Sequence, residues 1–167
     1  MKIRLTALLT VIAAVVLSLI AVSKYAGVDA VKITGFAVSD GEINKLADAP
    51  KDRITEDQIR MSDGTIVIKL AGATIGQLED TGSMKPLLDA NSNTLMIKPE
   101  RAEDIKEGDI VAYQSEEAEG LVVHRVAKRG IDENGWFAIA KGDNSKANDP
   151  KKVRFRQIKY VVVGILY

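Results

Sequence analysis

The chain has 167 residues, 46% of them hydrophobic and 28% charged, which suits one ordinary domain with an appended segment and excludes a large multidomain assembly. Lys plus Arg equals Asp plus Glu at 23 each, so the sequence has no basic excess to hold a polyanion and predicts no nucleic-acid partner. Cysteine is absent and His124 is the one histidine, which excludes disulfide frameworks, cysteine nucleophiles and metal sites built from several histidines.

The first predicted element is an apolar segment near the N-terminus. Residues 5–23 carry no charge, and a helix of this length, at about 1.5 Å per residue, nearly crosses a hydrocarbon layer of about 30 Å. Lys2 and Arg4 precede the segment and Lys24 follows it, so the positive-inside rule predicts a cytoplasmic N-terminus. The small-x-small sequence at its end is also typical of a cleaved signal peptide, but so long an apolar run favours a retained anchor over residues 1–23.

The rest of the chain divides into an irregular part and a β-rich part. Residues 24–60 are interrupted by Gly35, Gly41 and Pro50, and we interpret them as a juxtamembrane spacer or small subdomain. Residues 61–167 contain short β-branched runs between turns, a pattern typical of a mostly β domain. Strands are expected at residues 65–70, 95–98, 109–113, 121–127, 136–140 and 160–165, and the alternation of residues 151–160 also suits a half-exposed strand.

The single histidine lies inside one of these predicted strands. Alternation places His124 on the same face as Val122 and Val126. Taken alone, such a histidine is most simply a residue at the edge of the core. A hydroxyl nucleophile, however, needs an adjacent base, and that base needs a third group to fix its tautomer. Ser and Asp side chains in loops at strand ends would therefore change the interpretation of His124.

Two loops carry such side chains. The first places Ser83 after a glycine and shortly before Pro86. The second, residues 141–150, holds Asp143 and Asp149 six residues apart, directly after a predicted strand. Either loop alone is typical of a turn whose side chains bond their own backbone. Their combination with one histidine is what suggests a catalytic site.

Together with the anchor, these features resemble the type I signal peptidases, in particular the archaeal and endoplasmic-reticulum branch of that family. The resemblance extends over about residues 77–165, roughly half the chain. Four boxes occur in the order typical of the family: Ser83-Met84-Lys85-Pro86, Gly108-Asp109-Ile110-Val111, His124-Arg125, and Gly142-Asp143-Asn144 followed by Asp149.

The resemblance implies a signal-peptidase-like β domain and a serine endopeptidase that cuts after small residues through an acyl-enzyme, without a cofactor or metal. It implies Ser83 as nucleophile and His124 as general base. Asp149 is implied as the acid that orients His124, and Asp143 is the alternative acid. The backbone N–H of Ser83 and the hydroxyl of Thr81 are the implied donors to the oxyanion.

Substrate contacts, partners and location follow from the same resemblance. Met84 and Pro86 are expected to contact the substrate, and an extended substrate is expected to pair with a sheet edge at residues 75–80. The expected partners are precursor proteins that carry signal peptides and the lipid bilayer around residues 5–23, while accessory subunits are left open. The expected location is the cell membrane or the endoplasmic-reticulum membrane, with the catalytic domain outside the cytoplasm.

Two features depart from the family, and one alternative follows. About sixty residues separate Ser23 from Ser83, whereas in the family the nucleophile often follows the anchor closely. Leu87 stands after Pro86, where a hydroxyl residue is usual. The alternative is a catalytically inactive, membrane-tethered β domain that serves as a binding or assembly subunit. The joint presence of the serine, the histidine and both aspartates favours the enzyme.

Overall fold

The computed structural model describes residues 48–167. The predicted anchor, residues 1–23, and most of the predicted spacer, residues 24–60, lie outside the described residues. Of the described residues, 43% are in strands and 8% are in helices, so the expectation of a mostly β fold is confirmed. Within the same part of the chain, no helix is long and apolar enough to cross a membrane.

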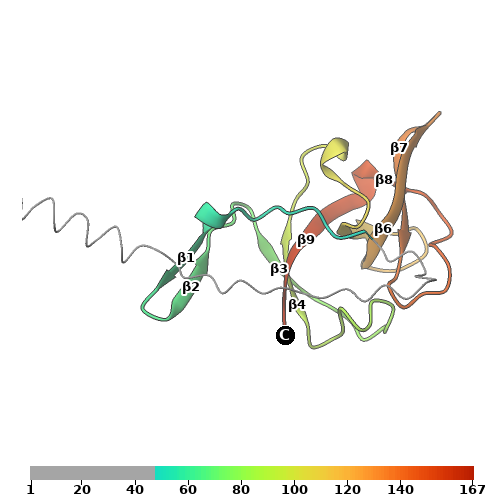
Figure 1. Cartoon of the computed structure of the whole chain (residues 1–167). Coiled ribbons are helices and arrows are strands. Elements are labelled where there is room, and N and C mark those ends of the chain that lie inside the picture. The colour runs from blue at the N-terminus through green and yellow to red at the C-terminus, as the bar shows by residue number, and fades with distance from the viewer. Residues whose placement is uncertain (1–47) are drawn as a thin grey trace, which may run out of the picture. The chain divides into compact units, whose positions relative to one another are not determined.

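The strands form two antiparallel sheets (Figure 1). The smaller is a hairpin of β1 (Ile59–Ser62) and β2 (Thr65–Ile68), closed by Asp63 and Gly64, which both have positive φ angles, as this two-residue turn requires. The larger has seven strands in the order β3-β4-β9-β5-β6-β7-β8. Its strands are β3 (Thr74–Gln77), β4 (Asn93–Ile97), β5 (Ile110–Gln114), β6 (Leu121–Asp132), β7 (Gly135–Lys141), β8 (Val153–Arg154) and β9 (Ile158–Leu166).

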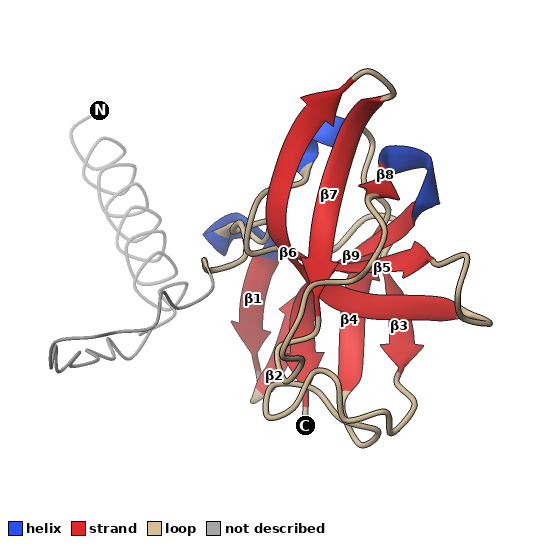
Figure 2. Ribbon diagram, turned by 90° about the vertical axis from the view of Figure 1, so that its right-hand side faces the viewer, coloured by secondary structure: helices blue, strands red, loops and turns tan. Residues whose placement is uncertain are grey.

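The larger sheet is dominated by a long hairpin of β6 and β7, which curves as it runs (Figure 2). Its register shifts between Val126 and Lys128, an irregularity of the kind that bends a strand pair. The helical turns are short 3-10 helices: η1 (Glu56–Gln58), η2 (Ala102–Asp104) and η3 (Phe155–Gln157). Strand β3 is one edge of this sheet and β8 is the other.

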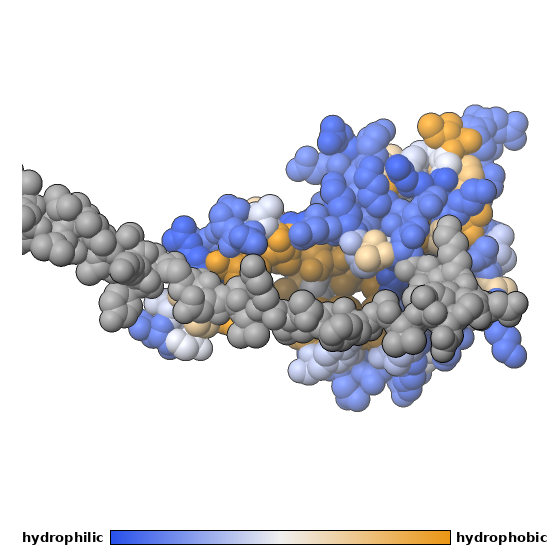
Figure 3. All heavy atoms as spheres, viewed as in Figure 1, coloured by the Kyte–Doolittle hydropathy of each residue, from blue (hydrophilic) through white to orange (hydrophobic). Residues whose placement is uncertain are grey.

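Strand β5 is buried on both faces, which explains why its sequence is a continuous apolar run. Val111 and Tyr113 belong to one core cluster, and Ile110 and Ala112 belong to a second. Hydrophilic side chains cover much of the face in Figure 3, and apolar side chains are visible between them. The two apolar clusters hold β5 rigidly at the centre of the sheet.

The six strands expected from residues 65–70, 95–98, 109–113, 121–127, 136–140 and 160–165 all have counterparts in the structure. The strand expected over residues 151–160 was wrong in its middle, because η3 separates β8 from β9. The ring of Phe155 packs edge-on against that of Trp136, with 6.2 Å between the ring centroids. The backbone N–H of Arg154 donates to the side chain of Gln157. These contacts stabilise a turn where the alternation of charged and apolar residues predicted extended backbone.

The described part of the predicted spacer is bound to the β domain. The carboxylate of Asp109, which is fully buried, accepts hydrogen bonds from the backbone N–H of Lys51 and from the guanidinium of Arg53. Gly108 has a positive φ, and a Cβ at this position would collide with the backbone of Asp48 and Ala49. The Gly-Asp box at residues 108–109 therefore holds the segment that leads into the domain.

Candidate active site

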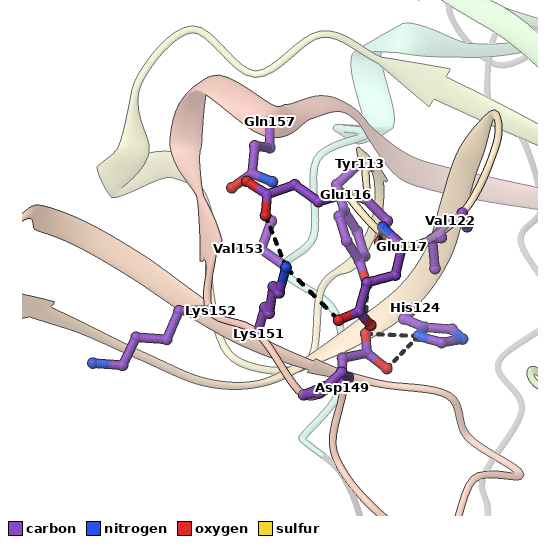
Figure 4. A pocket seen from close by; sticks show the side chains of 13 residues that line it. Tyr113, Glu116, Glu117, Val122, His124, Asp149, Lys151, Lys152, Val153 and Gln157 are labelled. Atoms are coloured by element: carbon purple, nitrogen blue, oxygen red, sulfur yellow. Dashed lines mark hydrogen bonds and ion pairs between the residues drawn. The ribbon is translucent and has the colours of Figure 1, made fainter.

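Three side chains that are far apart in the sequence meet in one row. The Oγ of Ser83 lies 3.1 Å from Nε2 of His124. On the other side of the ring, Nδ1 of His124 lies 2.9 and 2.8 Å from the two carboxylate oxygens of Asp149 (Figure 4). The structure thus brings together the predicted nucleophile, base and orienting acid.

The direction of these hydrogen bonds follows from the chemistry of the groups. An ionised carboxylate only accepts hydrogen bonds, so Nδ1 of His124 must carry a proton and donate it to Asp149. In the neutral ring Nε2 is then unprotonated and accepts from the hydroxyl of Ser83. This is the tautomer in which a histidine can remove the proton of a serine hydroxyl.

Ser83 is positioned by the turn that surrounds it. Gly82 has a φ of 70°, a left-handed conformation that glycine adopts without strain. Met84 and Leu88 are buried in the second core cluster, and the backbone N–H of Leu88 donates to the carbonyl of Met84. The half-buried Ser83, the predicted nucleophile, therefore lies between a glycine in a left-handed conformation and two buried apolar side chains.

The two predicted oxyanion donors are next to each other. The hydroxyl of Thr81 lies 3.2 Å from Oγ of Ser83. The backbone N–H of Ser83 points toward the same hydroxyl, with 3.5 Å between N and Oγ1. Both groups can thus approach an oxygen that develops negative charge beside Oγ of Ser83.

His124 is held by the rigid centre of the sheet. It lies in β6 opposite Val111 of β5. Val126 is buried in the first core cluster and Val122 packs against that cluster, as the predicted strand face requires. The side chain of His124 is 13% exposed, so most of the ring is covered while one edge stays accessible.

Asp149 lies in the loop between β7 and β8, where its backbone N–H donates to the carbonyl of Ala140. Burial alone would raise the pKa of its carboxyl, but hydrogen bonds from His124 and from Tyr113 outweigh burial and lower that pKa. The hydroxyl of Tyr113 donates to Oδ2 of Asp149 at 2.6 Å. Sequence reasoning missed Tyr113, because a tyrosine inside an apolar strand gives no sign of which group its hydroxyl reaches.

Asp143, the alternative acid, has a different partner. Both of its oxygens accept from the guanidinium of Arg125, at 2.8 and 2.7 Å. A third N–H of Arg125 donates to the carbonyl of Gly108. Since consecutive side chains of a strand point to opposite faces, Arg125 draws Asp143 away from the face that carries His124. The structure therefore assigns contact with the ring to Asp149.

The Gly-Asp-Asn box fastens the turn that carries Ser83, the predicted nucleophile. The backbone N–H of Asn144 donates to the carbonyl of Ser83 at 2.8 Å, and its side-chain amide donates to the carbonyl of Gly82 at 3.1 Å. A Cβ on Gly142 would lie 2.7 Å from the carbonyl oxygen of Ser83 and 3.1 Å from Nε2 of His124. Only a glycine leaves room for this close approach.

A groove of about 580 Å³ runs past the serine and the histidine. Met84 is among the residues that line it, whereas Pro86 is exposed and is not in its lining. Residues 76–79, at the end of the edge strand β3, form part of its wall, so the predicted sheet edge borders the groove. Its charged lining residues are acidic: Glu79, Asp89 and Glu119.

Within residues 48–167, the structure contains no group of three or more His, Asp or Glu side chains that could hold a metal ion. Lys141 lies opposite Arg125 in the pairing of β7 with β6.

In the comparisons with known proteins, the chain matches no family model, no curated protein and no solved structure. The geometry of the site and the motifs of the sequence therefore carry the functional argument.

Proposed function

We propose that this protein is a membrane-anchored serine endopeptidase that removes signal peptides from exported precursor proteins. The observation that carries the proposal is the unbroken row of hydrogen bonds from Ser83 through His124 to Asp149, together with the groove that Ser83 and His124 line. A nucleophile, a base and an orienting carboxylate in contact are the working parts of a serine peptidase. The order of the four boxes supports the narrower proposal, because it resembles the type I signal peptidases.

The proposed reaction begins when Oγ of Ser83 attacks the scissile carbonyl while Nε2 of His124 takes its proton. Asp149 keeps the ring in place and stabilises the imidazolium that forms. The backbone N–H of Ser83 and the hydroxyl of Thr81 donate to the oxyanion. His124 then gives its proton to the leaving amine. Water, activated by the same ring, attacks the acyl-enzyme and releases the free carboxylate and Ser83.

The proposed substrate is an extended segment that lies along the groove. The edge strand β3 offers backbone groups with which such a segment can pair. The groove is lined in part by the apolar side chains of Met84, Leu88 and Met96, which suit apolar side chains before the cut. The preference for small ones rests on the resemblance to the type I signal peptidases. An anchor over residues 1–23 would confine the enzyme to the bilayer that also holds the precursors and raise its effective concentration toward them.

The test uses the full chain in detergent and a precursor with an Ala-x-Ala site. The Ser83→Ala variant is expected to lower the cleavage rate by about 10⁴-fold to 10⁶-fold, because the nucleophile is removed while the fold stays intact. The control is Ser62→Ala, at the exposed end of β1, which is expected to cleave at the unmodified rate. Cleavage by Ser83→Ala at the rate of the unmodified chain would overturn the proposal and favour a tethered binding domain.

A further inference from the structure

Tyr113 brings a fourth polar group into the row. Its ring is 5% exposed and belongs to the first core cluster, so its position is fixed by the packing of β5. Its hydroxyl donates to Oδ2 of Asp149, the same oxygen that lies 2.8 Å from Nδ1 of His124 (Figure 4). Burial, reinforced by the neighbouring carboxylate, raises the pKa of Tyr113, so the hydroxyl keeps its proton at neutral pH and acts as a donor.

The residues that meet at the carboxylate of Asp149 differ in their secondary structure. Tyr113 and His124 lie on the paired central strands β5 and β6, whereas Asp149 comes from a loop without regular secondary structure. A carboxylate that met only the ring of His124 could still turn about its own side-chain bonds. A second donor from another strand restricts that rotation.

A small cavity lies beside the contact between Tyr113 and Asp149. A space of about 210 Å³ opens beside the carboxylate, and Tyr113, His124 and Asp149 all line it. Both lysines at its wall already have carboxylate partners: Lys151 pairs with Glu116 at 3.0 Å and with Glu117 at 3.8 Å, and Lys152 pairs with Asp132 at 2.7 Å. Without the tyrosine hydroxyl, Oδ2 of Asp149 would keep Nδ1 of His124 as its side-chain donor, and a water from this space would take the place of the lost hydroxyl.

We propose that Tyr113 is a positioning residue: its hydroxyl holds Asp149 in the orientation that fixes the tautomer of His124. The proposal rests on the proposed function for its meaning in catalysis, but the tautomer itself is measurable without activity. Tyr113 does not touch the reacting atoms. It acts through Asp149, which acts through the ring.

The test is nitrogen NMR of the imidazole in the full chain labelled with ¹⁵N, in detergent. His124 is the one histidine of the sequence, so its ring signals need no assignment. When its ring is neutral, the unmodified chain is expected to show a protonated Nδ1 and an unprotonated Nε2. Tyr113→Phe keeps the ring and removes the hydroxyl. It is expected to give a mixture of the two tautomers and a kcat about 10-fold lower at an unchanged KM.

Two further variants complete the design. Tyr160→Phe makes the same chemical change on β9, where the side chain packs against the second core cluster, and is expected to alter neither measurement. Asp149→Asn provides a reciprocal reading, because a neutral amide is a weaker acceptor than a carboxylate. The hydroxyl proton of Tyr113 is therefore expected to move upfield in that variant.

The outcomes separate the two proposals. An unchanged tautomer and kcat in Tyr113→Phe, or an unmoved Tyr113 hydroxyl signal in Asp149→Asn, would overturn the positioning role even if Ser83→Ala abolishes cleavage. A changed tautomer together with normal cleavage by Ser83→Ala would support the positioning of Asp149 by Tyr113. Normal cleavage by Ser83→Ala would count against the proposed peptidase reaction, but not against the positioning of Asp149.

Discussion

The two carboxylates of the loop after β7 have partners that are neighbours in β6. Asp149 bonds His124, and Asp143 bonds Arg125. A guanidinium keeps its protons at any working pH, so the pair of Arg125 with Asp143 is a fixed bond. A neutral imidazole can accept a proton at its free ring nitrogen and give it back, so the pair of His124 with Asp149 can take part in acid–base chemistry.

The surroundings of the two pairs differ in the same way. Arg125 also donates to the carbonyl of Gly108, next to the buried Asp109 that binds Arg53. On this side of β6, the pair of Arg125 with Asp143 is therefore linked to the contact between Asp109 and Arg53. On the other side, the row from Asp149 ends at Ser83 and an open groove. An aspartate paired with a basic side chain thus braces the domain on one face and belongs to the proposed reaction site on the other.

In this comparison the largest expected effect comes from Asp149→Asn, with Asp143→Asn as the matched variant. Asp149→Asn is expected to lower kcat by about 10⁴-fold, because an amide that donates to Nδ1 moves the ring proton to Nε2, where it blocks the serine. Asp143→Asn retains an oxygen for Arg125 and is expected to stay within about 10-fold of the unmodified kcat. Precursor cleavage measures both. A larger loss in Asp143→Asn than in Asp149→Asn would reverse the roles assigned to the two carboxylates.

The second prediction concerns stability. Arg125→Met removes three hydrogen bonds and leaves Asp143 without its cation. It is expected to lower the free energy of unfolding by about 2 kcal/mol, a value that allows for the partial exposure of the pair. Urea unfolding measures this change. Lys128→Met, an exposed change in the same strand, is the control and is expected to shift the urea midpoint little.

Two readouts separate bracing from catalysis in that variant. Arg125→Met is expected to keep kcat/KM within about 10-fold of the unmodified value while the protein is folded, because the row of Ser83, His124 and Asp149 remains. A collapse of activity without a loss of stability would mean that Arg125 acts on the reaction itself.

The smallest expected effect is a pH dependence of stability. The carboxyl of Asp149 has a folded-state pKa below its ordinary value of 3.8, because the hydrogen bonds from His124 and Tyr113 outweigh the effect of burial. Its contribution to stability is present above 3.8 and is lost as the pH falls through the folded-state value. The stability gap between the unmodified chain and Asp149→Asn should therefore narrow on acidification below that pH. Urea titrations at several pH values test this, and a gap that widens on acidification would contradict it.

Much of the β architecture was predictable because its signals are local. β-branched runs and turn residues located the strands, and alternation placed His124 on the face of Val122 and Val126. Strand β3 was harder to find, because Gly76 weakens its strand pattern. The structure explains this glycine, since a Cβ there would collide with Met96.

The site was predictable in part. Ser83, His124 and the two aspartates could be nominated from their residue types and their order, but Asp143 and Asp149 lie in one loop with similar local sequence. Their partners are more than fifteen residues away along the chain, so short-range patterns carry no information about them. The contact of Tyr113 with Asp149 spans 36 residues and was invisible for the same reason.

The sequence by itself determined a mostly β domain, a short list of polar candidates and the absence of thiol chemistry, because composition, alternation and turn chemistry are properties of neighbouring residues. The tertiary structure decided which carboxylate meets the imidazole, which one is held by arginine, and which tyrosine hydroxyl completes the row. The physical reason is that hydrogen bonds act over about 3 Å in space, and only the pairing of strands brings distant parts of the chain within that distance.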